Sequence, residues 1–191
     1  MAADGLPSRF GNITDVAWCD LVERAAETLD IGPGTQIFEV GCGAGAFLYP
    51  LFENGFVVGG IDPSDARLRL AAEAMPAGRW SHGDAASLDP GAPWDVVVAS
   101  AAFADFPDLD YARGVLARMA AKAGHAVAVL DVPDLDTRDD TRVGEAPRLY
   151  YDRRWMLRAL AEIGVKAVQI EDHRIEGHAN SRGRFNVFAR L

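Results

Sequence analysis

One segment near the start of the chain joins an apolar run, three alternate glycines and a second apolar run. It extends from Thr35 to Phe47 and reads T-Q-I-F-E-V-G-C-G-A-G-A-F. Because glycine tolerates positive φ and lets the backbone approach a ligand closely, Gly41, Gly43 and Gly45 predict a tight turn. A buried strand that breaks into glycines and restarts as a helix is typical of the ligand-binding turn of an open α/β sheet. We expect the N–H groups at the start of that helix to donate to polar ligand atoms.

The carboxylate in this segment favours one class of ligand. The letters G-C-G-A-G-A also satisfy the glycine fingerprint of nicotinamide-binding proteins. Glu39, however, would repel a pyrophosphate and attract a cationic amino group. The pattern E-x-G-x-G-x-G resembles the first motif of the Rossmann-like S-adenosylmethionine-dependent methyltransferases. The resemblance implies that S-adenosylmethionine is the cofactor, with S-adenosylhomocysteine as product, and that its methionine end contacts Glu39, Gly41, Cys42, Gly43 and Gly45.

Two further acidic residues follow at strand ends. Asp62 lies 19 residues beyond Gly43, about where dinucleotide-type folds place a carboxylate on ribose hydroxyls. A carboxylate suits two vicinal hydroxyls because it accepts from both. By resemblance, Asp84 after the third predicted strand would accept from the adenine amino group. The remaining residues predicted at the cofactor are Pro63, Ala85 and Ser100.

The chain alternates predicted strands and helices. We expect a single domain, 1–191, with a three-layer Rossmann-like methyltransferase fold, an α/β architecture whose seven-stranded sheet is mostly parallel and ends in an antiparallel C-terminal strand pair. The predicted helices are 14–30, 45–54, 64–75, 109–122 and 150–163. The predicted strands are 37–40, 56–61, 79–83, 94–100, 124–132, 165–170 and 185–191.

Composition narrows the range of partners. The net charge of −9 argues against a broad surface for nucleic acid or anionic membrane. The two cysteines make neither a disulfide framework nor a metal cluster, so no metal is expected. The N-terminal residues do not read as a signal peptide, and no apolar run approaches the roughly 20 residues that cross a membrane. We therefore expect a cytoplasmic enzyme with a small-molecule substrate, as a monomer or homodimer.

The acceptor side of the site is less specific. After strand 94–100 many members of the resembled family carry histidines, whereas this chain carries Asp105, either a substrate contact or a surface turn. The polar segment 133–150 is either a lid or a surface insert. The segment between the last two strands reaches the active site in the resembled fold, although a solvated tip remains the alternative. Candidate substrate contacts are Asp105, Tyr150, Asn180 and Arg182, and candidate catalytic bases are His173 and His178.

The predicted reaction is an in-line methyl transfer to a small polar acceptor, such as a sugar or a secondary metabolite. Much of the catalysis of such a displacement comes from alignment of the reacting atoms. O-methylation is the favoured chemistry, and a histidine suits removal of the hydroxyl proton near neutral pH. One alternative is a protein that binds S-adenosylmethionine without methylating, as a cyclase or a regulator. The other, a nicotinamide-dependent oxidoreductase, is disfavoured because the chain contains no Tyr-x-x-x-Lys pair.

Overall fold

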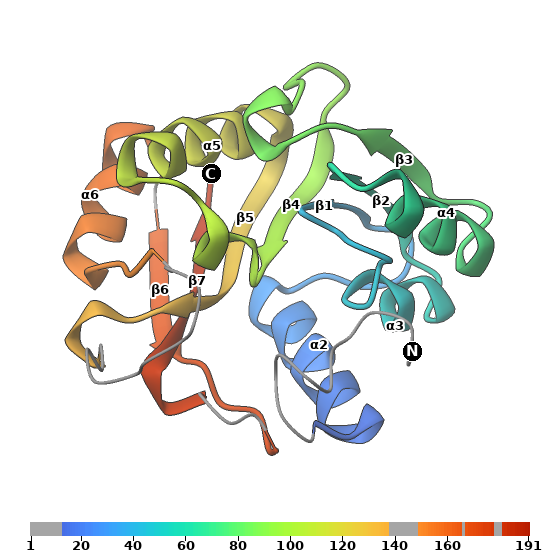
Figure 1. Ribbon diagram of the computed structural model, residues 1–191, viewed down its shortest axis with the longest axis horizontal. Helices are drawn as coiled ribbons and strands as arrows, with labels where there is room; N and C mark the ends of the chain where they lie inside the picture. The colour runs from blue at the N-terminus through green and yellow to red at the C-terminus, as the bar shows by residue number, and fades with distance from the viewer. Residues whose placement is uncertain (1–12, 138–148, 166, 178–180) are drawn as a thin grey trace.

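The computed structural model describes residues 13–137, 149–165, 167–177 and 181–191. In it, a central sheet lies between two layers of helices (Figure 1). The helices are α2 (Asp15–Leu29), α3 (Leu48–Glu53), α4 (Asp65–Ala74), α5 (Leu109–Lys122) and α6 (Arg153–Glu162). The strands are β1 (Gln36–Val40), β2 (Val57–Asp62), β3 (Arg79–His82), β4 (Trp94–Ser100), β5 (Ala123–Pro133), β6 (Ala167–Asp172) and β7 (Arg184–Arg190).

The sheet has the strand order β3-β2-β1-β4-β5-β7-β6. Strands β3, β2, β1, β4 and β5 pair in parallel, and β7 is antiparallel to both β5 and β6. This arrangement confirms the predicted fold class. The chain leaves β1 toward β2 on one side and returns to β4 on the other, so a crevice opens beyond the carboxyl ends of β1 and β4. In open α/β sheets, ligands bind at such a switch point.

Both faces of the sheet are buried at its centre, which explains the apolar run Val96 to Ala99 of β4. Along that strand Val97 faces a core shared with α5 and α6, whereas Val96 and Val98 face a core shared with α2, α3 and α4. Successive side chains of a strand point to opposite faces, so consecutive positions are apolar where a strand is covered on both sides.

Two helices begin later than the sequence predicts. Helix α3 starts at Leu48 rather than at residue 45, because Gly43 and Gly45 have φ values of 55° and 83° and continue the turn. Helix α6 starts at Arg153 rather than at residue 150, because the Asp152 side chain accepts from the Arg154 N–H and caps the helix there. A capping residue has extended backbone angles and therefore marks the boundary.

A buried lysine ties α5 to the loop that precedes β4. The Lys122 Nζ donates to the carbonyl oxygens of Asp89, Gly91 and Ala92, at 2.9, 2.9 and 3.3 Å. The side chain is 5% exposed, and its burial lowers the pKa of the amino group. The ammonium thus donates to three carbonyls of this loop and holds it against the end of α5.

Replacement of Lys122 by methionine is expected to lower the free energy of unfolding by about 1–3 kcal/mol, because it removes three charge-assisted hydrogen bonds while keeping the apolar stem. Urea denaturation measures the change. Ala121→Met, which places the same side chain on the exposed neighbouring position, is the control. A loss equal to that of the control would show that the lysine contributes nothing to this loop.

The segment 133–150 is described only at its two ends. Leu135–Thr137 forms a short 3-10 helix, and Tyr151 pairs with the end of β5 through bonds from the Tyr151 N–H to the Pro133 carbonyl and from the Leu135 N–H to the Tyr151 carbonyl. Residues 138–148 lie outside the described residues, so the lid stays a prediction. In the part of the chain that the structure describes, no helix has the length and apolar character needed to cross a membrane.

Candidate functional site

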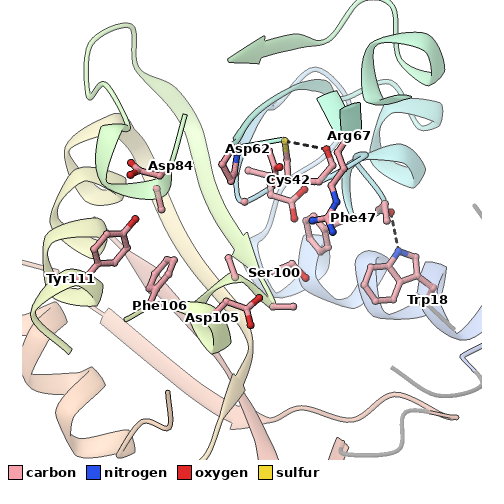
Figure 2. Close-up of a pocket in the computed structure, with 18 residues that line it drawn as sticks. Trp18, Cys42, Phe47, Asp62, Arg67, Asp84, Ser100, Asp105, Phe106 and Tyr111 are labelled. Carbon is pink, nitrogen blue, oxygen red and sulfur yellow. Dashed lines mark hydrogen bonds between the residues drawn. The ribbon is translucent and has the colours of Figure 1, made fainter. Parts of the chain in front are cut away.

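A cavity of about 360 Å³ opens at the carboxyl ends of β1, β2 and β4 (Figure 2). Its walls come from the glycine turn after β1, the ends of β2 and β4, the segment after β3, and α2. The described residues that line it are Trp18, Glu39, Gly41, Cys42, Gly43, Ala46, Phe47, Asp62, Pro63, Arg67, Asp84, Ala85, Ser100, Ala101, Ala102, Asp105, Phe106 and Tyr111. Every residue predicted at the cofactor lines this cavity except Gly45.

The glycines of the turn serve different purposes. Gly41 has φ 74°, and a Cβ there would lie 2.8 Å from the Ala102 Cβ, across the floor of the cavity. Gly43 has φ 55° and faces the cavity. Gly45 has φ 83° but packs away from it, because its Cβ would meet the Met75 Cε at 2.3 Å. The first two glycines therefore keep the cavity open, whereas the third allows close packing against α4.

Four amides of the turn donate to acceptors within the protein, and the expectation that the N–H groups at the start of the following helix donate to a ligand stays a prediction. The Gly41 and Cys42 N–H groups both donate to the Ile61 carbonyl, at 2.8 and 3.1 Å. The Gly43 N–H donates to the Asp62 carboxylate at 2.9 Å, and the Gly45 N–H donates to the Cys42 carbonyl at 2.8 Å. These bonds hold the turn against the end of β2 and fix its shape at the edge of the cavity.

Three carboxylates stand at successive strand ends around the cavity. Glu39 is 3% exposed at the end of β1, and Asp62 is 4% exposed at the end of β2. Asp62 accepts through one oxygen from Gly43 N–H and through the other from Ser64 N–H, both at 2.9 Å. Asp84 accepts from the Ser87 N–H at 2.8 Å and so caps the turn after β3. The carboxylates of Asp62 and Asp84 are thus held by backbone N–H groups beside the cavity.

The edge of the cavity after β4 is a short 3-10 helix, Ala102–Asp105. Two hydrogen bonds join this helix to the segment that leads into α6. The Tyr151 hydroxyl donates to the Phe103 carbonyl at 2.9 Å, and the Leu149 N–H donates to the Ala104 carbonyl. Burial of the Tyr151 phenol raises its pKa above the ordinary value, so the donor stays protonated. Asp105 at the end of this helix lines the cavity, and its role as a substrate contact stays a prediction.

Several lining residues escaped the sequence analysis. Trp18 is 9% exposed and borders the cavity, and its indole N–H donates to the Ala46 carbonyl at 2.9 Å. Tyr111 accepts from the Ala86 N–H through its hydroxyl. Phe47, Arg67 and Phe106 complete this set. Only tertiary packing brings α2 and α5 to the cavity, and the sequence carries no local signal for that.

The proposed catalytic histidine lies elsewhere. His173 is 3% exposed and does not line the cavity; its Nδ1 is 2.9 Å from the Asn186 Oδ1, and its Nε2 is 3.6 Å from the Asp131 Oδ1. Arg184 completes this buried cluster with a 2.9 Å ion pair to Asp131. The structure therefore corrects the placement of His173. The His173 N–H donates to the carbonyl of Arg184, the first residue of the antiparallel strand β7, and this pairing keeps the histidine beside the sheet and away from the cavity.

The other candidates on the acceptor side are not brought together. Tyr150 is described and does not line the cavity. His178 and Asn180 lie outside the described residues, and so does the side chain of Arg182. Within the described ranges, no group of three or more His, Cys, Asp or Glu side chains is placed to hold a metal ion.

Comparisons with known proteins agree with this geometry. Residues 38–139 match the family model of a methyltransferase domain. The chain is 35% identical over 130 residues to nocamycin O-methyltransferase of Saccharothrix syringae, covering 62% of this chain and 46% of that protein. It is 38% identical over 65 residues to the ubiquinone biosynthesis O-methyltransferase of Bradyrhizobium diazoefficiens, covering 34% of this chain and 25% of that protein. The chain thus spans less than half the length of these curated relatives.

Solved structures share the fold at low sequence identity. An amino pentose methyltransferase from Micromonospora echinaspora, solved with S-adenosylmethionine bound, superposes with a TM-score of 0.75 at 19% identity, covering 91% of this chain and 92% of that one. An S-adenosylmethionine-dependent methyltransferase from Clostridium acetobutylicum gives 0.74 at 13% identity, covering 100% and 96%. These similarities confirm the fold predicted from the glycine turn and its alternating strands and helices.

Proposed function

We propose that this chain, which belongs to the methyltransferase domain family, transfers the methyl group of S-adenosylmethionine to a small polar acceptor. The observation that carries the proposal is the convergence of Glu39, Asp62 and Asp84 on one cavity at the switch point of the sheet. The three carboxylates come from three different strand ends, so only the fold brings them together. Family membership bears out the resemblance that the glycine turn predicted.

The residues present fit this cofactor. Glu39 is a buried carboxylate that suits a cationic ammonium, and the missing side chains of Gly41 and Gly43 leave space beside it. Each Asp62 oxygen already accepts one backbone N–H but retains a lone pair, so the group can still accept from two ribose hydroxyls. Asp84 lines the same cavity, and we assign to it the adenine amino group. When bound, the sulfonium supplies an electrophilic methyl group and leaves as a neutral thioether.

The protein's contribution to transfer is mainly alignment and exclusion of water. The aromatic rings of Trp18, Phe47 and Phe106 give the cavity apolar walls, and the rigid 3-10 helix after β4 fixes its open edge. Holding a nucleophile in line with the methyl group accounts for much of the rate enhancement in such displacements. For a hydroxyl acceptor, one group must also take the proton, and among the described lining residues Asp105 is the carboxylate on the acceptor side.

Oxygen methylation of a sugar or secondary metabolite remains the favoured chemistry. Support comes from the curated relatives, which are named O-methyltransferases, and from the amino pentose methyltransferase that shares the fold. The acidic cavity, with carboxylates at Glu39, Asp62, Asp84 and Asp105, favours a neutral or cationic acceptor over an anionic one.

Asp105→Asn is expected to reduce methyl transfer at least about tenfold, because the amide cannot take the acceptor's proton. The affinity for S-adenosylhomocysteine should stay unchanged, since we assign this carboxylate to the acceptor and not to the cofactor. Steady-state transfer and calorimetric binding measure the two quantities. Asp110→Asn, an exposed acid on the next helix, is the matched control. Full activity of Asp105→Asn would remove this residue from the proposed mechanism.

Turnover of methyl-labelled S-adenosylmethionine with a library of small hydroxyl and amine acceptors tests the proposed function. Transfer of label to any acceptor supports it and identifies the acceptor class. Tight binding of S-adenosylhomocysteine with no transfer across the library would favour the alternative, a protein that binds the cofactor without methylating.

A further inference from the structure

We propose that Arg67 binds the carboxylate group of the cofactor's methionine end and so distinguishes the complete cofactor from its adenosine half. This assignment rests on the proposed function, because it takes the cavity as the S-adenosylmethionine site. Arg67 lies on α4, outside the glycine turn and the strand-end acids that the sequence singles out. Its role therefore has to be argued from the geometry.

The charges around the cavity leave one ligand group without a counterpart. The methionine end carries both an ammonium and a carboxylate. Glu39 suits the ammonium, and the other carboxylates that line the cavity, Asp62, Asp84 and Asp105, would repel a ligand carboxylate. Among the described lining residues Arg67 is the single cation. Electrostatics alone therefore assigns the ligand's negative group to the side of the cavity where Arg67 lies.

The glycine turn does not supply the missing donors. The amides of Gly41, Cys42, Gly43 and Gly45 all donate to acceptors inside the protein. Helix α3, which follows, has six residues and no side-chain cap, so its dipole is too short to replace a charged partner. A charged side chain would therefore be a stronger partner for a ligand carboxylate than these amides or this short helix.

Arg67 is placed to be that donor. Its backbone is fixed in the first turn of α4, where its N–H donates to the capping Ser64 Oγ. Its side chain runs along the glycine turn: the Arg67 Cδ would lie 3.9 Å from a Cβ built on Gly43. Figure 2 shows the guanidinium directed into the cavity on the side of Phe47. The arginine side chain thus packs beside the glycine turn at the edge of the cavity.

The guanidinium is also available for a ligand. Within the described part of the chain, it makes no hydrogen bond or ion pair. A guanidinium offers a planar fork of N–H donors that matches a carboxylate in a bidentate arrangement, which a lysine ammonium does not. Bidentate recognition would fix the amino-acid end and with it the orientation of the sulfonium.

The test compares two ligands that differ only in the amino-acid end. S-adenosylhomocysteine carries the carboxylate, and 5′-methylthioadenosine keeps the adenosine and sulfur but lacks it. Arg67→Met is expected to weaken S-adenosylhomocysteine binding about tenfold in calorimetry while leaving methylthioadenosine binding unchanged. Arg67→Lys should lose part of that affinity. Arg69→Met, two residues along the same helix and outside the cavity, is the matched control and should change neither.

Two results would overturn the assignment. One is an unchanged affinity of Arg67→Met for S-adenosylhomocysteine, and the other is an equal weakening of both ligands, which would mean a general disturbance of the cavity. Thermal unfolding of each variant establishes that it is folded. A wild-type protein that binds neither ligand would instead overturn the proposed function, and this assignment with it.

Discussion

Replacement of Asp62 by alanine is expected to lower the affinity for S-adenosylhomocysteine at least about a hundredfold, since two charge-assisted hydrogen bonds to ribose are lost together. Isothermal titration calorimetry measures the loss directly. The effect should be large because the carboxylate is 4% exposed and pre-oriented by the Gly43 and Ser64 amides. No rearrangement of the side chain is needed when the hydroxyls arrive.

The same substitution releases two backbone amides, so its effect on the fold has to be separated from its effect on binding. Asp62→Asn keeps an oxygen acceptor of the same shape and should lose less affinity than Asp62→Ala. Asp65→Ala, an exposed acid in the first turn of α4, is the matched control and should bind normally. If Asp62→Ala is folded in thermal unfolding and still binds as tightly as wild type, the ribose assignment is wrong.

Arg184→Met is expected to destabilise the protein by about 3–5 kcal/mol, because it leaves the Asp131 carboxylate buried without its charged partner. The Arg184 Nη1 lies 2.9 Å from the Asp131 Oδ1 and donates to the Asp131 carbonyl at 3.0 Å. Both residues are about 5% exposed or less. Equilibrium denaturation in urea measures the loss.

A double variant and a surface variant make this prediction specific. Asp131→Asn combined with Arg184→Met removes both charges and should recover most of the lost stability, since the cost comes from the orphaned carboxylate. Arg158→Met removes an exposed arginine on α6 and should change stability by less than about 0.5 kcal/mol. If the single variant loses less than the surface control, the buried pair does not hold β5 to β7 as described.

The fold was predictable because the apolar runs, the helix caps and the glycine breaks all indicate the same order of strands and helices. The apolar run of β4 and the capped helix α5 have the boundaries that the sequence predicts, 94–100 and 109–122. Boundaries shifted where a special backbone conformation intervened. The positive φ values of Gly43 and Gly45 delay α3, and the Asp152 cap delays α6.

The candidate site was predictable only in part. The residues at strand ends, such as Glu39 and Asp62, could be placed because parallel strands deliver their carboxyl ends to one edge of the sheet. Arg67 and Trp18 could not, because both sit on helices whose inward faces depend on tertiary packing. His173 was misplaced because its sequence position beside a strand end gives no sign that Asn186 and Asp131 bury it.

The central claim is that Glu39 and the glycine turn make this cavity a site for a cationic amino acid joined to adenosine, and not for a dinucleotide. Calorimetric titration of the wild-type protein with S-adenosylhomocysteine and, separately, with NADH tests it most directly. We predict saturable one-to-one binding of S-adenosylhomocysteine and no measurable heat from NADH at the same concentrations. Saturable binding of NADH with no binding of S-adenosylhomocysteine would contradict the account.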